Sequence, residues 1–344
     1  MDEENAFNKF TLGVNYSQTQ NFNDNFIAKG TGTSSIDNYF LGYADGIPLE
    51  LLETVENETV GDLYSYLGEN EGFGAQQAFL GYQGYILNPN SNDPANTQYT
   101  STIAPGSFNQ NYSYLATGLN GKFSFNFASE FNNFLYLGAN LNAHFLNYDR
   151  ITNLFETNTN AGSETNEVVF SNNLSTAGNG FSLQVGTIAK VSENFRVGVS
   201  YETPTWFTIS EKTTQRLETY STELDDLVLV EPNIVNLYPD YKLKTPGKIT
   251  GSVAILFGTT GLLSFDYSHK DYSSTELRPA GDPEFMYQNN LISQNLKAAS
   301  TYKVGGEYRI SRLSLRGGYR FEESPYKNEM TIGNLEGYSA EFGI

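Results

Sequence analysis

Apolar and polar residues alternate with a period of two along much of this chain. Between positions 135 and 145, one set of alternate residues is apolar and the other is small or polar. The apolar set is Leu135, Leu137, Ala139, Leu141, Ala143 and Phe145, and the set between them is Tyr136, Gly138, Asn140, Asn142 and His144. Strict alternation places the two sets on opposite faces of an extended chain. Such segments therefore predict strands with one apolar and one polar face.

The alternating segments occur in pairs joined by very short turns. They predict strands at about residues 8–20, 22–30, 108–129, 134–156, 167–189, 195–215, 241–257, 262–277, 298–310, 313–324 and from 335 onward. Tight turns fall at 130–133, 190–194, 258–261 and 311–312, and the other junctions are long polar loops. Short turns on one side and long loops on the other are typical of transmembrane β-barrels, with the turns in the periplasm.

We therefore predict an all-β fold, a transmembrane antiparallel up-and-down β-barrel with about ten to eleven strands, in a single domain over residues 1–344. A soluble β-sandwich is disfavoured because its strands are typically about 5–6 residues long. Residues 31–106 interrupt the strand pattern. Apolar residues at helical spacing in 36–67 and 75–87 predict a partly helical loop insertion on the extracellular side.

Composition narrows the functional classes. The net charge of −19 argues against nucleic acid as a partner, since phosphate binding requires a basic surface. The absence of cysteine excludes disulfides and cysteine-based metal sites, and the two histidines give little support to a metal or haem site. No convincing Ser-His-Asp spacing or phosphate-binding glycine motif occurs. We expect neither an enzyme nor a cofactor.

The polar faces of the strands carry charges of both signs, and these faces would line the barrel lumen. The cationic and imidazole side chains that we select as candidate ligand-binding residues are Lys122, His144, Arg196, Lys303, Arg309, Arg316 and Arg320. Carboxylates such as Glu202, Glu307 and Glu322 share these faces. Two interpretations stay open: ion pairs that fill and stiffen the lumen, and a basic patch that binds an anionic group such as a carboxylate.

Three hairpins carry recognisable sequence motifs. They are Gly180-Phe-Ser-Leu-Gln-Val-Gly186 with Asn194-Phe-Arg-Val-Gly-Val-Ser-Tyr-Glu-Thr-Pro204, Leu243-Lys-Thr-Pro-Gly-Lys248 with Gly261-Leu-Leu-Ser-Phe-Asp-Tyr267, and Thr301-Tyr-Lys-Val-Gly-Gly-Glu-Tyr-Arg309 with Leu313-Ser-Leu-Arg-Gly-Gly-Tyr-Arg-Phe321 and Ser324-Pro325. In these motifs the chain resembles the FadL-type outer-membrane transporters of long-chain fatty acids and hydrophobic compounds, which include the TodX type. The resemblance covers residues 108–344 well and 1–107 loosely.

The resemblance implies a fourteen-stranded barrel with an N-terminal plug, located in the bacterial outer membrane. It implies passive uptake of a hydrophobic small molecule such as a fatty acid, through the lumen and a lateral opening in the wall. The partners would be this ligand and outer-membrane lipid, and the protein would be a monomer. The plug, its Asn-Pro-Ala segment, a signal sequence and the closing strands do not appear in these residues, and we expect the chain to be a fragment of such a barrel.

By the same resemblance, the insertion at 31–106 corresponds to the loops that first capture ligand. The candidate capture residues are Phe40, Tyr43, Leu51, Phe73, Phe79 and Tyr82. The alternative for these residues is packing between the loop helices. For the whole protein, the alternatives are a general porin-like channel, motivated by the polar lumen, and a structural or adhesive outer-membrane protein, motivated by the acidic loops.

Overall fold

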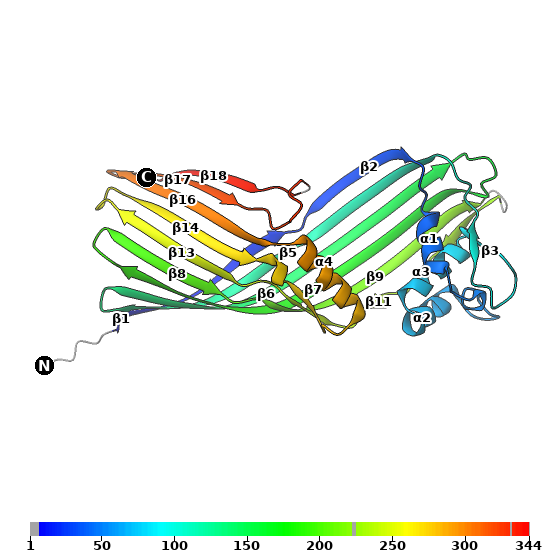
Figure 1. The fold of residues 1–344 in the computed structure, drawn as a ribbon, viewed down its shortest axis with the longest axis horizontal. Helices are drawn as coiled ribbons and strands as arrows, with labels where there is room; N and C mark the ends of the chain where they lie inside the picture. The colour runs from blue at the N-terminus through cyan, green and yellow to red at the C-terminus, as the bar shows by residue number, and fades with distance from the viewer. Residues whose placement is uncertain (1–6, 222–224, 331, 344) are drawn as a thin grey trace.

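The chain folds into a strongly curled antiparallel sheet with a helical cap at one end (Figure 1). This computed structural model describes residues 7–221, 225–330 and 332–343. Along the main path of the sheet the strands are β1 (Phe7–Asn21), β5 (Phe108–Phe131), β6 (Leu135–Asn158), β7 (Thr165–Lys190), β8 (Phe195–Glu202), β13 (Lys248–Leu256), β14 (Gly261–Asp271), β16 (Ala298–Ile310), β17 (Leu313–Glu322) and β18 (Leu335–Gly343). The predicted all-β antiparallel architecture is confirmed.

All four predicted tight turns lie at one end of the sheet, which we call the turn end (Figure 1). They connect β5 to β6, β7 to β8, β13 to β14 and β16 to β17. Asn132 and Asn133 have φ angles of 50° and 53°, a left-handed conformation that asparagine tolerates better than most residues. The longer connections lie on the opposite side of these strands, so the asymmetry predicted from the sequence is confirmed. The connections after β2 and β6 reach the far end of the sheet, the loop end, whereas those after β14 and β17 end near the middle of the molecule (Figure 1).

The sheet has an apolar convex face and a polar concave face. Each of the 24 residues of β5 pairs with one residue of β6 without a shift in register. The apolar and polar faces therefore stay separate along the whole length of these two strands. Large apolar side chains on the convex face are well exposed near the turn end. They include Phe123, Phe125, Phe127, Leu141, Phe181, Val185, Val199, Ile255, Leu263, Val304 and Leu315. Toward the loop end the convex face becomes mixed. Ser113, Asn153 and Ser171 are joined by hydrogen bonds there, while Ile151 and Phe155 stay exposed.

Three neighbouring strands are interrupted at the same level, which we call the crease. The segment 203–205 separates β8 from β9 (Trp206–Ser221), 245–247 separates β12 (Tyr241–Lys244) from β13, and 272–275 separates β14 from β15 (Glu276–Arg278). Pro204 and Pro246 lie in two of the breaks and have no backbone N–H for a ladder bond. The predictions of unbroken strands over 195–215, 241–257 and 262–277 were therefore wrong at this level.

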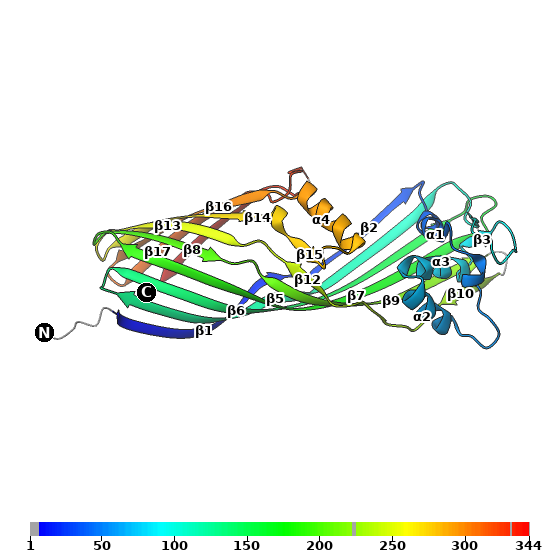
Figure 2. The ribbon, with the colours of Figure 1, turned by 60° about the horizontal axis from the view of Figure 1, so that its bottom comes forward.

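Bonds across the crease keep the sheet continuous. The Thr203 N–H donates to the Leu183 carbonyl at 2.8 Å, and the Thr245 N–H donates to the Thr205 carbonyl at 2.9 Å. Beyond it, β9 carries β10 (Asp226–Val230), β11 (Asn236–Leu237) and β12 toward the loop end (Figure 2). Helix α4 (Pro283–Asn295), which the sequence pattern did not predict, follows β15.

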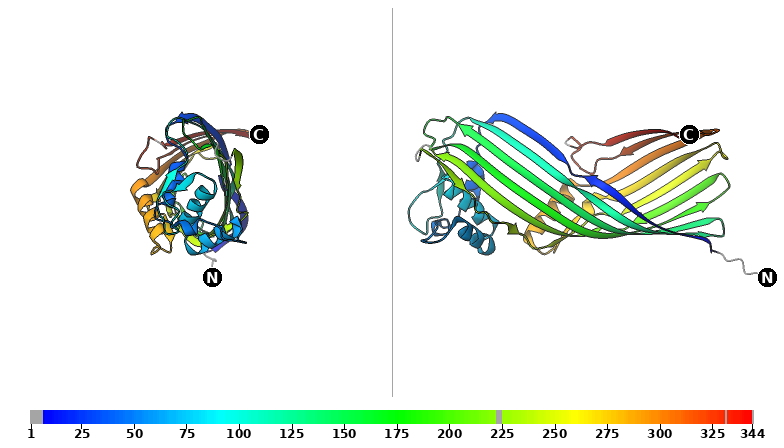
Figure 3. Two further views of the ribbon diagram at one scale, coloured as in Figure 1. Left: turned by 90° about the vertical axis from the view of Figure 1, so that its right-hand side faces the viewer. Right: turned by 180° about the vertical axis from the view of Figure 1, so that it is seen from behind.

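The predicted insertion forms a helical cap at the loop end, on the concave side of the sheet (Figure 3). It contains α1 (Asp37–Ala44), the short η1 (Leu49–Leu51), α2 (Val60–Asn70) and α3 (Phe73–Gln83), and a small hairpin of β3 (Leu87–Pro89) and β4 (Tyr99–Ser101). Strand β2 (Asp24–Gly32) leads into the cap, and β5 leads out of it. The predicted helical segments are confirmed, whereas the hairpin was not predicted.

The cap and the wall of the sheet share one apolar core. Phe40, Leu67 and Phe79 of the cap are fully buried and belong to the same cluster as Phe170 and Leu217 of the wall. Burying a side chain of this size contributes about 1.5–3 kcal/mol relative to leaving it exposed. The cap is therefore attached by a substantial apolar interface.

A buried network of amide side chains also joins the cap to the wall. Gln77 of α3 and Gln215 of β9 exchange two bonds of 2.7 and 3.0 Å, and Gln215 donates to Asn172 of β7 at 2.5 Å. The Tyr64 hydroxyl donates to Gln215 at 2.8 Å. A buried amide without partners would cost about 1–3 kcal/mol, so this arrangement favours one docked position of the cap.

A methyl group at Gly84 would disturb this docking. A Cβ there would collide with the Leu217 side chain and approach the Leu80 carbonyl oxygen to 2.9 Å. We expect Gly84→Ala to destabilise the docked cap by about 1–3 kcal/mol, the usual effect of overpacking. Hydrogen exchange of α3 amides should accelerate. Gly42→Ala in α1 is the matched control, because a Cβ at that position would have nothing within 4 Å. Equal exchange in both variants would contradict the expectation.

Candidate functional site

Three cavities of the described concave face bear on function, and they lie between the turn end and the cap. The register of the strands decides which residues reach them, because alternate residues of each strand share a face. Even-numbered residues of β6 and β7 face inward, as shown by the bond between Glu156 and Ile36 at the start of the cap and by the bond between Asn172 and Gln215, which itself bonds the cap. The inward-facing set of each strand therefore supplies the side chains that line the cavities.

Four basic side chains line a partly open cavity of about 330 Å³, which we call the basic pocket. They are Lys248, Lys270, Lys303 and Arg320, from four neighbouring strands. Lys248 pairs with Lys270 across β13 and β14, and Lys303 pairs with Arg320 across β16 and β17. Thr19 of β1 lines the same cavity, so the curl of the sheet brings its first strand opposite β17. The only carboxylate in this lining is Glu322.

The charges of the basic pocket are only partly compensated. Glu322 pairs with Arg320, and Lys248 lies 3.2 Å from Glu202, which also lies 3.8 Å from Lys122. The Lys270 ammonium lies 4.8 Å from the centre of the Tyr272 ring, in a cation–π contact. Lys303 has no hydrogen-bond or ion-pair partner in the described part of the chain. In a chain with a net charge of −19, this cavity concentrates positive charge.

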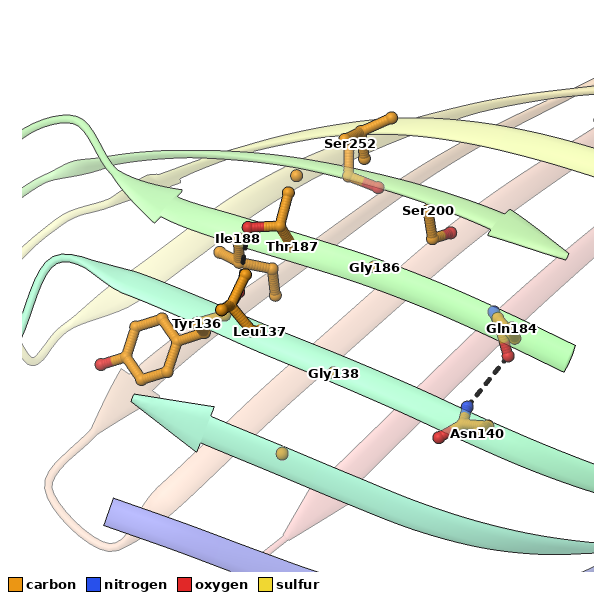
Figure 4. A pocket seen from close by; sticks show the side chains of 13 residues that line it. Tyr136, Leu137, Gly138, Asn140, Gln184, Gly186, Thr187, Ile188, Ser200 and Ser252 are labelled. Atoms are coloured by element: carbon orange, nitrogen blue, oxygen red, sulfur yellow. Dashed lines mark hydrogen bonds between the residues drawn. The ribbon is translucent and has the colours of Figure 1, made fainter. Parts of the chain in front are cut away.

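A second cavity, the turn-end hollow, lies closer to the tight turns (Figure 4). Its volume is about 330 Å³, and small residues such as Ala128, Gly138 and Gly186 make its floor. Tyr136 and Ile188 border it, and Asn140 donates to Gln184 at 3.0 Å along its side. Small side chains leave room for an apolar group, and the few polar groups can orient it. Ser252 of this hollow pairs with Asp266, which in turn pairs with Lys303 of the basic pocket.

A third cavity of about 380 Å³ lies between the cap and the wall, and we call it the under-cap pocket. Tyr39 and Phe73 of the cap and Tyr112 and Phe170 of the wall contribute four aromatic rings to it. Tyr39 donates to Gln77 at 3.0 Å, which holds its ring in place. Burial raises the pKa of Tyr39, and it raises the pKa of Tyr64 to about 12, so both hydroxyls act as neutral donors.

Aromatic side chains continue from the under-cap pocket toward the middle of the sheet. Phe26 of β2 stacks on Tyr114 with ring centres 5.0 Å apart. The Tyr114 and Tyr148 hydroxyls lie 2.9 Å apart, and Phe22 packs edge-on against Tyr148 at 5.6 Å. Further along, His144 packs against Phe207 at 5.7 Å. This aromatic track covers the concave face between the under-cap pocket and the level of the crease.

The structure separates the predicted lumen residues into groups. Lys303 and Arg320 reach the basic pocket. Arg309 and Arg316 pair instead with Glu307, and Arg316 also lies 2.7 Å from Glu341. These two arginines therefore match the interpretation as ion pairs that stiffen the wall.

The other predicted lumen residues also lie outside the basic pocket. His144 is buried and bonds Ser182 at 2.8 Å within a polar ladder, so its ring has a structural partner. Arg196 lies near the turn end, opposite Lys190 and Ala254. Lys122 reaches Glu202 at the edge of the pocket. Lys248 and Lys270 share the inward parity of Ser252 and Asp266 and lie within the predicted strands, so the alternation was sufficient to identify both, although neither was selected.

The predicted capture residues are also divided. Phe40 and Phe79 are 0% exposed and pack in the core of the cap, where no ligand reaches them in this conformation. Phe73 lines the under-cap pocket, and Tyr43 packs edge-on against it at 5.7 Å. Leu51 packs against the cap core, and Tyr82 bonds Glu53 at 3.2 Å. Of the six, only Phe73 borders this cavity.

Two kinds of feature are absent from the residues that the structure describes. No cluster of three or more His, Cys, Asp or Glu side chains is suitable for a metal ion among them. In the same residues, no helix combines the length and apolar character needed to span a membrane.

Comparison with known proteins finds similarity at the level of fold. No protein-family model matches the chain, and no curated protein does. Among solved structures, the chain is similar to the CymD monoaromatic hydrocarbon channel, with 14% identity, a TM-score of 0.45, and coverage of 72% of this chain and 74% of that one. It is similar to the Ralstonia pickettii toluene transporter TbuX, with 14% identity, a TM-score of 0.39, and coverage of 69% and 72%.

A third similar structure is the Pseudomonas putida toluene transporter TodX, with 12% identity, a TM-score of 0.41, and coverage of 72% of this chain and 75% of that one. At TM-scores below 0.5 these matches carry no argument about the function of this chain, which has to come from the geometry of its concave face.

The pairing of Glu202 with two lysines predicts an effect on ion selectivity. Glu202→Gln removes the partner of Lys122 and Lys248 and leaves their charges exposed to the lumen. We expect the reversal potential of the protein in planar bilayers under a salt gradient to shift toward anion selectivity. Glu167→Gln at the loop end, where Glu167 pairs with Tyr220 in the sheet, serves as the matched control. A shift toward cation selectivity in Glu202→Gln would contradict this assignment.

Proposed function

We propose that this protein is an outer-membrane channel for passive uptake of hydrophobic molecules that carry an anionic head group, of which long-chain fatty acids are the leading example. The observation that carries the proposal is the basic pocket on the same concave face as the apolar turn-end hollow. Four cations and one lining carboxylate suit a single anionic group, and the hollow suits an apolar tail. The mechanism requires no chemical step and no cofactor.

The convex face supports a position in the outer membrane. Its exposed apolar residues form a band near the turn end, as expected for lipid contact. A tilted barrel strand needs about 9–11 residues to cross the hydrocarbon layer, whereas β5, β6 and β7 have 24, 24 and 26 residues. The loop-end half of these strands would therefore stand outside the membrane, with the cap on the extracellular side and the tight turns in the periplasm.

The concave face supports a route from the cap to the turn end. A ligand would enter beside the cap, pass along the aromatic track at Tyr114 and Tyr148, and reach Lys303 and Arg320 in the basic pocket. Aromatic rings present apolar surface without holding an apolar tail in one place, which suits a passing ligand. Phe73 is the predicted capture residue that this route would use.

A second candidate function is uptake of neutral aromatic hydrocarbons. The aromatic track favours it, because its rings need no anionic partner. The names of the similar solved structures refer to this class of compound, as monoaromatic hydrocarbons and toluene. A general porin is the third candidate, and steady conductance of small ions without discrimination between ligands would favour it.

A charge-neutral basic pocket distinguishes these candidates. We expect Lys270→Gln/Lys303→Gln to lower uptake of labelled oleate into liposomes about tenfold, since a charge-assisted hydrogen bond contributes about 1.5–3 kcal/mol. Uptake of the neutral alcohol oleyl alcohol should stay within twofold of wild type.

The matched control for this experiment is Lys212→Gln, since Lys212 pairs in β9 with Leu237 at the loop end, away from the basic pocket. Loss of neither substrate would support a channel that does not recognise the anionic head group, such as a hydrocarbon channel or a porin. Equal loss of both would show that the two lysines act on transport without recognising the head group. Either result would contradict the proposed preference for anionic ligands.

A further inference from the structure

The under-cap pocket contains one cation, Arg150 of β6. Arg150 pairs with Ala116 and Leu174 across the sheet, on the inward-facing parity of its strand, and lines the cavity together with Tyr39 and Phe73. The position lies loop-ward of the convex apolar band, because Phe145 of the same strand is the last large apolar residue of the unbroken run that begins at Leu135. The cavity is therefore separate from the basic pocket in the middle of the sheet.

The Arg150 guanidinium has no hydrogen-bond or ion-pair partner among the residues that the structure describes. No carboxylate lines this cavity within those residues. Glu156 lies on the same strand as Arg150, but its carboxylate is engaged at the start of the cap. It accepts hydrogen bonds from Ser35, the Ile36 N–H and Gln110. A guanidinium presents five donors in a planar fork that matches a carboxylate. Arg150 thus offers its donors to the cavity.

The walls around Arg150 are aromatic and held in place. Phe170 packs edge-on against Phe40 of the cap core at 5.2 Å, and Tyr39 packs against the same ring at 5.2 Å. Phe73 is fixed by its contact with Tyr43. Fixed rings favour flat ligands and lose little conformational entropy on binding. The polar side chains Thr152, Asn172 and Thr213 provide further donors and acceptors at the rim of the cavity.

The size of the cavity selects among anionic ligands. Its volume of about 380 Å³ lies near the lower limit of about 300–1,000 Å³ for small-molecule sites. A compact ring system fits this space better than the extended tail of a long-chain acid does. From the unpaired guanidinium, the fixed rings and this volume, we propose that the under-cap pocket is a binding site for small aromatic carboxylates, in which Arg150 holds the carboxylate and the rings of Tyr39, Phe73, Tyr112 and Phe170 enclose the aromatic body.

The biological role of this site rests on the proposed uptake function. A small aromatic carboxylate would bind at the under-cap pocket before it reaches the basic pocket. The site and the basic pocket are nevertheless separable by mutation. The Lys270→Gln/Lys303→Gln protein, which retains Arg150, serves as the parent in which binding at the basic pocket is removed.

The test is isothermal titration of the protein in lipid nanodiscs with 2-naphthoate and with the neutral 2-naphthalenemethanol. In the Lys270→Gln/Lys303→Gln parent, we expect 2-naphthoate to bind at least tenfold more tightly than the alcohol. Adding Arg150→Gln should remove this preference and leave affinity for the alcohol within twofold. Arg150→Lys keeps the positive charge but lacks the planar set of guanidinium donors, so this variant should show part of the preference for 2-naphthoate. Arg312→Gln is the matched control, since Arg312 lies in the turn between β16 and β17, away from this pocket.

Protection of the cap from protease establishes that each variant is folded. Unchanged 2-naphthoate affinity after Arg150→Gln would overturn the assignment of this site, and so would equal affinity for the acid and the alcohol in the parent. These outcomes differ from failure of the proposed function, which would appear as wild-type oleate uptake in the Lys270→Gln/Lys303→Gln protein. The two failures are therefore distinguishable, because they arise in different variants and with different ligands.

Discussion

The separation of the two faces of the sheet depends on an unbroken register between long strands. Every residue of β5 opposes one residue of β6, from Phe108 with Asn158 to Phe131 with Leu135. A slip by one residue would turn Phe125 into the lumen and Asn126 toward the convex side. The basic pocket, the turn-end hollow and the aromatic track all consist of residues from different strands at matching heights. They exist only because this register is preserved across the curl.

Much of this architecture could be predicted because it follows from short-range rules. Alternation predicts strands and their faces, and left-handed positions such as Asn132 and Ser311 suit the tight turns. Helical spacing in the insertion predicts α1, α2 and α3. The crease was not predicted, although Pro204 and Pro246 interrupt the alternation there, because an apolar–polar pattern resumes beyond each break. Helix α4 was missed because its sequence is mostly polar and has no strong apolar stripe.

The candidate site was predictable only in part. The alternation in a strand shows which face of the sheet a residue is on, but it does not show how far along the sheet the residue lies or which side chain it pairs with. Parity correctly turned Lys303, Arg309 and Arg316 inward, yet only the structure shows that Glu307 engages the two arginines and leaves Lys303 unpaired among the described residues. The roles of the cap residues were even harder to predict from the sequence. Phe40, Phe73 and Phe79 have the same side chain, and their different roles depend on how each lies against wall residues such as Phe170 and Leu217, far along the chain.

The length of β5, β6 and β7 changes what the cap does for the sheet. In the hydrocarbon layer, no water competes for the backbone N–H and C=O groups of a strand. Where a strand leaves such a layer, water competes for these groups, and the end of the strand opens most easily. The core formed by Phe79, Phe170 and Leu217 joins the cap to the loop end of β7 and β9. The cap therefore adds buried apolar contacts to the part of the ladder that the strand length alone supports least.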